Sequence, residues 1–433
     1  MNLAPPVGPG PDLDHLLRPL FRAAAPGGGV AVVVIRGDER VVACRGHADR
    51  PGERPVRADT RFALGSVTKT FTGLLLAEMA ARGEVRYDDP IGRYLPADAA
   101  PGYPHERPIT LLHLATHTSG LPRLPVGLLP TAAPRWFTHP YATFGPAHLL
   151  RALPRTPVRG TPGAQVRYSN LGCGLLGLLL ANAAGQRYDD LLEARVCGPL
   201  GLVDTSCGPG RGDAAGYRRG RRVPSFRLPA LPGAAALRST ADDLLRYLQA
   251  HLALDAVPLS ERTDEEALRT ALGEVRRPRA GRRRGGTRIC LGWNHRWVPW
   301  AARAGRSDLL DLPGPPDLRD RAGAAEGGAG SRAIREGEGP GVVDAPGDEE
   351  PAGELRDDGA PDDGVPDDAA DEVVYHAGAT WGSTTFVGFS PRAQVGLAVM
   401  GGPLPLRSRG FVQSAYDTLR TLVVERRAAG SVS

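Results

Sequence analysis

Lysine is almost absent from this chain. The sequence contains 53 lysine and arginine residues, and Lys69 is the one lysine among them. An arginine can supply positive charge wherever charge alone is required, because its guanidinium stays protonated in proteins. A lysine amine can instead be desolvated and deprotonated until it acts as a base. We therefore expect Lys69 to stand where charge alone does not suffice; the alternative is a surface lysine near the start of a helix.

Cysteines and long apolar runs are also scarce. The five cysteines are Cys44, Cys173, Cys197, Cys207 and Cys290. An odd number without metal-type spacing argues against a disulfide framework, so we expect reduced thiols. The apolar run Val30–Ile35 is too short to span a bilayer, and residues 1–26 lack the pattern of a secretory leader. These absences predict a cytoplasmic protein that does not enter a membrane.

Positive charge is in small and local excess. The net charge of +5 is low for 433 residues, and the excess comes mainly from the arginines of residues 276–284. Aromatic residues do not interleave with these arginines as a base-stacking surface requires, so we expect no nucleic-acid partner. With 41% hydrophobic residues, the chain can bury a sizeable core and should fold by itself.

Patterns typical of strands occur near both ends of the chain, and helical patterns occur between them. Strands are predicted at Val30–Ile35, Arg40–Cys44, Val373–His376, Thr384–Phe389 and Val395–Met400. Helices are predicted from Ser66 to about Gly83 and at Ile109–Ala115, Leu171–Ala184, Tyr188–Val196, Thr240–His251 and Phe411–Glu425. We therefore expect a mixed α/β (α+β) fold, in which an antiparallel sheet from both chain ends is flanked by helices and an all-helical subdomain is inserted.

Residues 302–372 do not fit this core. They are dense in Gly, Pro, Ala, Asp and Glu, with few apolar residues. Such a composition cannot bury enough apolar surface to offset the entropy of ordering, so we predict a disordered acidic insertion. The rest divides into an N-terminal extension with a first helix (1–27), a main domain (28–301 and 373–427) and a tail (428–433).

A serine precedes the single lysine in the sequence Gly65-Ser66-Val67-Thr68-Lys69. Ser66 and Lys69 fall at i and i+3 of a nascent helix, so both side chains project from the same face. A serine hydroxyl is a poor nucleophile until a neighbouring base removes its proton, and a buried lysine can be that base. At a helix N-terminus, the backbone N–H of Ser66 can also stabilise a developing oxyanion.

A second candidate group is Tyr168-Ser169-Asn170, just before an apolar helix. A phenol facing Ser66 could accept a proton or relay one to a leaving group. The Asn170 carboxamide could bind both Lys69 and a substrate amide. The alternative is a turn in which Ser169 or Asn170 caps the helix.

A third group is His376-Ala377-Gly378 at the end of a predicted strand. Gly378 would let a substrate backbone approach the sheet edge, and the N–H of Ala379 could be a second oxyanion donor. The alternative is a structural histidine in a strand.

In this order the three groups resemble the serine β-lactamase superfamily, in particular the branch of class C β-lactamases, DD-carboxypeptidases and esterases, whose pattern is SxxK, YxN and then KTG or HxG. Further segments look like connecting signatures of this family: YDDPIGRYLP at 87–96, HTSGLP at 117–122, PG at 162–163, LRSTADD at 237–243 and LGW at 291–293. Together they cover most of residues 28–301 and 373–427.

The resemblance implies a serine hydrolase that forms an acyl-enzyme with an ester, an amide or a D-amino-acid peptide, without a cofactor. It implies that Ser66 is acylated and that Lys69 and Tyr168 share the acid/base work. The remaining site residues would be Asn170, His376, Gly378 and Ala379. It also implies an α/β sandwich beside a helical domain, with the site between them. His376 stands where class C β-lactamases have lysine, which resembles the carboxypeptidase and esterase members more.

Three other functions remain to be weighed. A non-hydrolytic acyltransferase, or a catalytically silent member that binds β-lactams or other ligands, would use the same residues. A zinc hydrolase could be argued from His113 and His117, which are spaced i and i+4. No glutamate follows His113 as in HExxH and no third ligand suggests itself, so packing or capping roles are favoured for both histidines and no metal site is expected.

Overall fold

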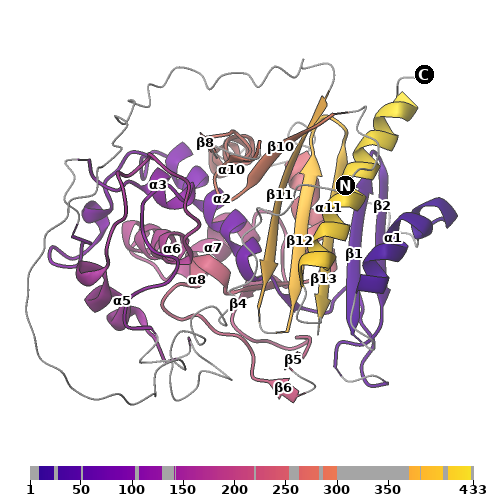
Figure 1. The fold of residues 1–433 in the computed structure, drawn as a ribbon, viewed down its shortest axis with the longest axis horizontal. Coiled ribbons are helices and arrows are strands. Elements are labelled where there is room, and N and C mark those ends of the chain that lie inside the picture. Colours follow the sequence, from indigo (N-terminus) through magenta and orange to yellow (C-terminus); the bar gives the residue numbers. More distant parts are fainter. Residues whose placement is uncertain are drawn as a thin grey trace, which may run out of the picture. The chain divides into compact units, whose positions relative to one another are not determined.

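The computed structural model has a large antiparallel sheet with helices on both faces and a helical region beside it (Figure 1). It describes residues 9–23, 28–49, 52–102, 107–128, 141, 143–218, 221–252, 263–281, 286–299, 370–380, 382–402 and 408–430. These residues belong to one compact unit, Met1–Pro313 with Val365–Ser433. Within the described ranges, no helix has the length and apolar character needed to cross a membrane.

The sheet joins segments from both ends of the chain. Its strand order in the described residues is β2-β1-β13-β12-β11-β10-β9-β8. The N-terminal strand β1 (Gly29–Arg36) pairs antiparallel with the C-terminal strand β13 (Val395–Gly402), with Val33 opposite Ala398. The other strands are β2 (Glu39–Arg45), β12 (Thr384–Ser390), β11 (Ala370–Ala379), β10 (Asn294–Pro299), β9 (Arg288–Ile289) and β8 (Ala280–Gly281).

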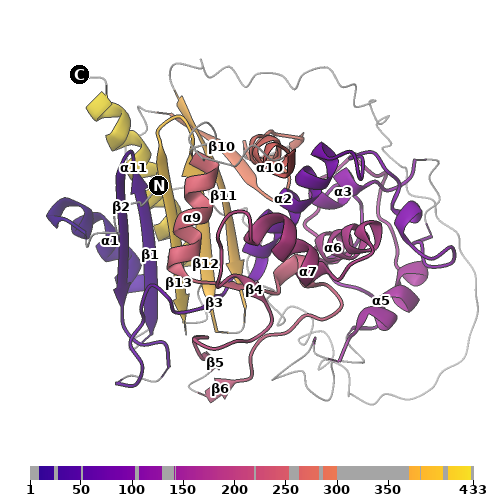
Figure 2. The same ribbon diagram turned by 180° about the vertical axis from the view of Figure 1, so that it is seen from behind.

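Helices cover both faces of this sheet. Figures 1 and 2 show α11 (Ser408–Gly430) and α1 (Pro11–Ala23) on one face and α9 (Ala241–Leu252) on the other. Every residue of β12 and β13 is buried as a result. This explains why β13 reads as a continuous apolar run instead of alternating with polar residues.

The helical region is built around α2 (Thr68–Ala81), which follows the 3-10 turn Gly65–Val67. Helix α2 is buried from Thr68 to Met79, so it has no solvent-facing side over this length. Helices α6 (Asn170–Ala184), α7 (Tyr188–Leu192), α8 (Pro232–Ala235) and α10 (Thr263–Glu274) contact it. The region also contains α3 (Leu111–Ala115), which packs on α6, and α5 (Pro146–Ala152). Short strands complete the structure: β3 (Phe62–Ala63), β4 (Ser206–Cys207), β5 (Gly216–Arg218), β6 (Arg221–Val223) and β7 (Leu237–Ser239).

Some predicted boundaries were wrong. Strand β11 begins at Ala370, so residues 370–372 belong to the sheet and not to the predicted insertion. Helix α11 continues to Gly430 through the first part of the predicted tail. Strands β8, β9 and β10 and helix α10 were not predicted. Residues 302–369 of the predicted insertion lie outside the described residues, so their disorder stays a prediction.

His251, near the end of α9, is fully buried among aromatic rings. Its ring stacks on Phe389 with 4.8 Å between ring centroids, and it meets Tyr247 and Trp293 edge-on. Neither ring nitrogen has a hydrogen-bond partner within the described ranges. Burial, helped by the charge of Arg276, lowers the pKa of His251 from its ordinary value of 6.5 to about 3. The folded protein therefore holds this ring in its neutral form.

We expect His251 to make the protein less stable as the pH falls from about 6.5 towards 3. In this window the ring stays neutral in the folded protein but takes up a proton in the unfolded chain, so protonation favours unfolding. Between pH 8 and pH 5 the loss should be about 2 kcal/mol. Urea unfolding at both pH values should show that His251→Phe loses less stability than wild type. If His251→Phe loses as much stability between pH 8 and pH 5 as wild type does, this account is wrong.

Candidate active site

The three side chains predicted to carry catalysis meet at Ser66. This residue lies in the 3-10 turn directly before α2. Its Oγ accepts hydrogen bonds from Lys69 Nζ at 2.9 Å and from the Tyr168 hydroxyl at 2.7 Å. Two groups that can exchange protons therefore point at a single hydroxyl oxygen, although Tyr168 is 102 residues away along the chain.

Lys69 is held inside the protein, with only 1% of its surface exposed. Besides its bond to Ser66, Nζ donates to the carbonyl oxygen of Ala234 at 2.8 Å. The Ala234 carbonyl was not predicted as part of the site. A backbone acceptor leaves no signal in the sequence, because every residue carries one.

Helix α8, which carries Ala234, is tied to α2 by further hydrogen bonds. Thr72 Oγ1 donates to the Gly233 carbonyl at 2.8 Å and shares a 2.8 Å hydrogen bond with the Tyr188 hydroxyl. The N–H of Leu237, just beyond α8, donates to Thr68 Oγ1 at 3.2 Å. These contacts fix the carbonyl that helps to orient the Lys69 amine.

Tyr168 comes from the extended segment that leads into α6. Ser169 is the N-cap of that helix: its Oγ accepts from the Gly172 N–H at 2.8 Å and donates to the Pro122 carbonyl at 2.7 Å. The capping interpretation is therefore correct for Ser169, and it coexists with the contact between Tyr168 and Ser66. The cap holds the backbone next to Tyr168 in a defined position.

Asn170 is the first residue of α6, and its predicted contact with Lys69 is not formed. Its Oδ1 is buried and has no hydrogen-bond partner among the described residues. Lys69 donates to Ala234 instead. A buried acceptor without a partner is costly, so Asn170 Oδ1 is suited to accept a hydrogen bond from a substrate N–H.

Part of β11 is open on the side that faces Ser66. Strand β10 pairs with β11 from Ala370 to Tyr375, and this pairing ends before His376. The N–H of Thr380 bonds to Ser383 in the following hairpin, and backbone groups alternate along a strand, so the N–H of Ala379 points to the opposite, open edge. The turn before Ser66 lies directly there, because a Cβ placed on Gly65 would be 2.7 Å from Ala379 N. This placement supports Ser66 N–H and Ala379 N–H as paired oxyanion donors.

Gly378 has a different role from the one predicted. A Cβ at this position would lie 2.0 Å from the Leu64 carbonyl oxygen and 2.8 Å from Ser66 N. The absent side chain therefore makes room for the protein's own turn that carries Ser66. The prediction that it makes room for a substrate backbone has no support in these contacts.

We expect Gly378→Ala to displace that turn from β11. Such overpacking against backbone atoms costs about 1–3 kcal/mol, and the shift of Ser66 should lower ester hydrolysis at least ~10-fold. Thermal unfolding and initial rates would measure both effects. The control is Gly396→Ala in β13, where a Cβ would meet the flexible end of Leu252 at 3.3 Å. Equal behaviour of the two variants would contradict the prediction.

His376 is almost fully buried, and the structure defines its tautomer. Its Nδ1 lies 2.8 Å from the Ala377 carbonyl oxygen. A carbonyl only accepts, so Nδ1 carries the hydrogen and Nε2 is a hydrogen-bond acceptor. Burial, together with the charge of Lys69, lowers the pKa of His376 to about 3. His376 therefore acts as a neutral acceptor.

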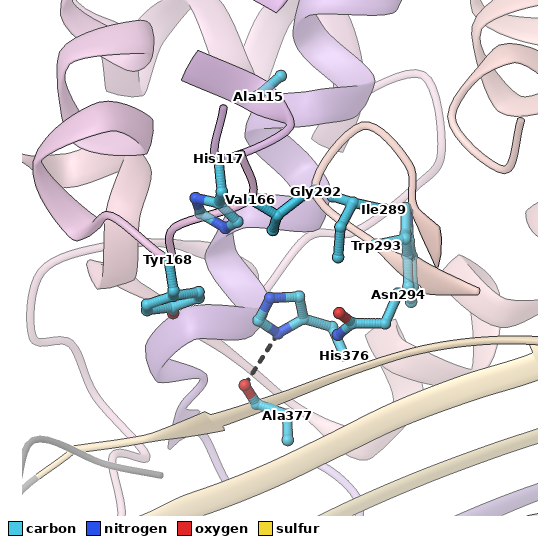
Figure 3. Close-up of a pocket in the computed structure, with 10 residues that line it drawn as sticks. All are labelled: Ala115, His117, Val166, Tyr168, Ile289, Gly292, Trp293, Asn294, His376 and Ala377. Carbon is cyan, nitrogen blue, oxygen red and sulfur yellow. Dashed lines mark hydrogen bonds between the residues drawn. The ribbon is translucent and has the colours of Figure 1, made fainter. Parts of the chain in front are cut away.

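A cavity of about 30 Å³ lies beside these residues, between the helical region and the sheet. Figure 3 shows the rings of His117, Tyr168 and His376 around it. Its full lining is Ala115, His117, Val166, Tyr168, Ile289, Gly292, Trp293, Asn294, His376 and Ala377. This volume is large enough for a water molecule.

His113 and His117 do not share a helix face. Helix α3 ends at Ala115, and His117 lies beyond it. The Nδ1 atoms of both residues accept from backbone N–H groups, those of Thr110 and Ser169 respectively. These contacts are capping and packing roles. The part of the chain that the structure describes contains no group of three or more His, Cys, Asp or Glu residues placed to hold a metal ion.

The chain matches a known protein family and several named relatives. A family model described as Beta-lactamase matches residues 17–401. The D-alanyl-D-alanine-carboxypeptidase/endopeptidase AmpH of Escherichia coli (strain K12) is 34% identical over 248 residues, which are 54% of this chain and 60% of that protein. A beta-lactamase of the same strain is 32% identical over 247 residues, 56% of this chain and 61% of the relative.

A third relative is the esterase EstB of Burkholderia gladioli, 31% identical over 280 residues, which are 55% of this chain and 69% of that protein. The chain thus spans about 60% of the length of the first curated relatives that it matches. The family match covers most of the chain, including every predicted site residue. The chain belongs to the beta-lactamase family.

Proposed function

We propose that this protein is a serine hydrolase that forms an acyl-enzyme at Ser66 with an ester or amide substrate. The observation that carries the proposal is the pair of hydrogen bonds that Ser66 Oγ receives from Lys69 and Tyr168. Relatives named as a carboxypeptidase, a beta-lactamase and an esterase support a reaction at a carboxylic ester or amide.

Acylation follows from this geometry. Either Lys69 or Tyr168 must first give up a proton so that it can accept the hydrogen of Ser66. Ser66 Oγ then bonds to the substrate carbonyl carbon, and the negative charge on the carbonyl oxygen is stabilised by the N–H groups of Ser66 and Ala379. When the bond to the leaving group breaks, the proton taken from Ser66 passes to that group.

Hydrolysis of the acyl-enzyme repeats these steps with water as the nucleophile. The same acid/base groups take a proton from water and return one to Ser66 Oγ as the ester bond breaks. The cavity beside Tyr168 and His376 is large enough to hold a water molecule close to these groups. This proximity supports hydrolysis over transfer to another alcohol.

The substrate class we favour is an ester or a small amide rather than a β-lactam. His376 is a neutral acceptor, so it does not offer a substrate carboxylate the cation that a lysine would. Asn170 Oδ1 offers a second acceptor without a partner in the described residues. Both features disfavour a substrate carboxylate and favour an ester or amide that carries a hydrogen-bond donor beside the reacting bond.

The test compares nitrophenyl esters of short acyl chains, a D-Ala-D-Ala peptide and a chromogenic cephalosporin. We expect ester turnover and, in rapidly quenched samples, a protein mass increased by one acyl group. Acylation by the cephalosporin without turnover of any substrate would instead indicate a silent binding protein. Products formed only with an added alcohol would indicate an acyltransferase, and the absence of acylation would reject the proposal.

A further inference from the structure

His117 has a backbone conformation that most residues avoid. Its φ angle is +61°, in the left-handed region, and it lies two residues beyond the end of α3. Among residues other than glycine, asparagine, aspartate and histidine enter this region most readily. A non-glycine residue there indicates that its surroundings hold it in place.

Two hydrogen bonds connect His117 to the residues on either side of Tyr168. The His117 carbonyl oxygen accepts from the Arg167 N–H at 2.7 Å. The ring Nδ1 accepts from the Ser169 N–H at 3.2 Å. One residue therefore holds the backbone both before and after the tyrosine that contacts Ser66.

The ring of His117 also packs on the ring of Tyr168. Their centroids are 4.5 Å apart and their planes are tilted by 46°. Figure 3 shows the two rings next to each other at the same pocket. His117 is only 6% exposed, so this contact is shielded from solvent. Histidine combines a ring, an acceptor at Nδ1 and tolerance of the left-handed conformation.

We propose that His117 is a positioning residue, which sets the place of the Tyr168 hydroxyl relative to Ser66. It acts chiefly through the hydrogen bonds that its carbonyl oxygen and its ring Nδ1 accept from the backbone N–H groups of Arg167 and Ser169. This inference rests on the proposed function, because it concerns proton transfer during acylation of Ser66. The left-handed conformation of His117 is what directs its carbonyl and its ring towards the same short segment.

Three variants separate the contributions of His117. Asparagine places Oδ1 where His117 has Nδ1 and tolerates the left-handed conformation, so His117→Asn should acylate within about threefold of wild type. His117→Phe keeps a ring but leaves the Ser169 N–H without its acceptor. His117→Gly keeps only the backbone conformation. We expect both to acylate ~10–100-fold more slowly, because small displacements of reacting groups have effects of this size.

The readout is the rate at which a fluorophosphonate labels Ser66, together with kcat and KM for a nitrophenyl ester. The loss should appear in kcat. The same substitutions are made in a Tyr168→Phe background, where His117→Gly should cause little further loss if it acts through the Tyr168 hydroxyl. A purely structural role would slow labelling equally in both backgrounds, and this result would overturn the inference.

The relative rates of the three variants separate the effects of the hydrogen bond and of the ring contact. If His117→Asn is as slow as His117→Gly, the ring contact positions Tyr168 and the role assigned to the hydrogen bond from the Ser169 N–H is wrong. If all three variants match wild type, the side chain of His117 does not position Tyr168, and the inference is overturned. If His117→Phe does not fold, the comparison of the asparagine and glycine variants still tests the proposal. Failure of wild type to be labelled would reject the proposed function itself.

Discussion

Ser66→Ala is expected to lower ester hydrolysis by ~10⁴–10⁶-fold, the range over which loss of a serine nucleophile acts. The variant lacks the oxygen that Lys69 and Tyr168 contact, so no acyl-enzyme can form. Residual rate above that of water would come from the oxyanion donors and from substrate binding. The measurements are kcat/KM and labelling by an activated fluorophosphonate, mapped to the peptide that contains Ser66.

A surface serine provides the matched control for this experiment. Ser414 on α11 donates to the Gly410 carbonyl at an exposed position, so Ser414→Ala should keep full activity and labelling. Labelling that persists in Ser66→Ala would remove Ser66 from the role of nucleophile. Retained activity together with labelling of another peptide would point to a different serine.

Lys69→Arg is expected to slow acylation by ~10²–10⁴-fold, the usual contribution of a general base. An arginine keeps the positive charge, but its guanidinium does not give up a proton at neutral pH and cannot accept the hydrogen of Ser66. Lys69 is also enclosed, with Nζ bonded to Ser66 and Ala234, so a bulkier group would displace its neighbours. Lys69→Met removes the amine without this added bulk and should be equally slow.

The acylation rate of each Lys69 variant is compared with wild type, and circular dichroism monitors the fold. Arg86→Lys is the control for exchanging the two basic residue types, because Arg86 pairs with Asp88 at an exposed position. It should retain wild-type activity. If Lys69→Arg acylated within about threefold of wild type, Lys69 would be an electrostatic support and Tyr168 would become the candidate base.

The elements predicted correctly from the sequence are those in which several successive residues have the same kind of surroundings, so that a pattern of residue types appears. The runs that form β1 and β13 are apolar because helices cover both faces of the sheet. Strands β8 and β9 have two residues each, which is too short for any periodic pattern to show. Their conformation is set by pairing: β8 pairs with β9, β9 pairs with β10, and β10 is itself paired with β11.

The residues at the centre of the site were predicted better than the contacts of the residues around them. Ser66, Lys69 and Tyr168 do meet. Asn170 does not contact Lys69, and Gly378 makes room for the turn of Ser66, contrary to prediction. His117 was assigned only a packing or capping role, and the i and i+4 spacing with His113 carried no information because the helix ends between them.

The sequence by itself determined the family, through its motifs and their order. It also determined the pairing of Ser66 with Lys69, because three residues of separation in a helical turn place both side chains on one face. Only the tertiary structure decided how Lys69 is oriented, which residues hold Tyr168 and why position 378 is glycine. Each of these depends on backbone carbonyl or N–H groups brought close by long-range folding. Such groups are the same in nearly every residue, so no residue type marks them in the sequence.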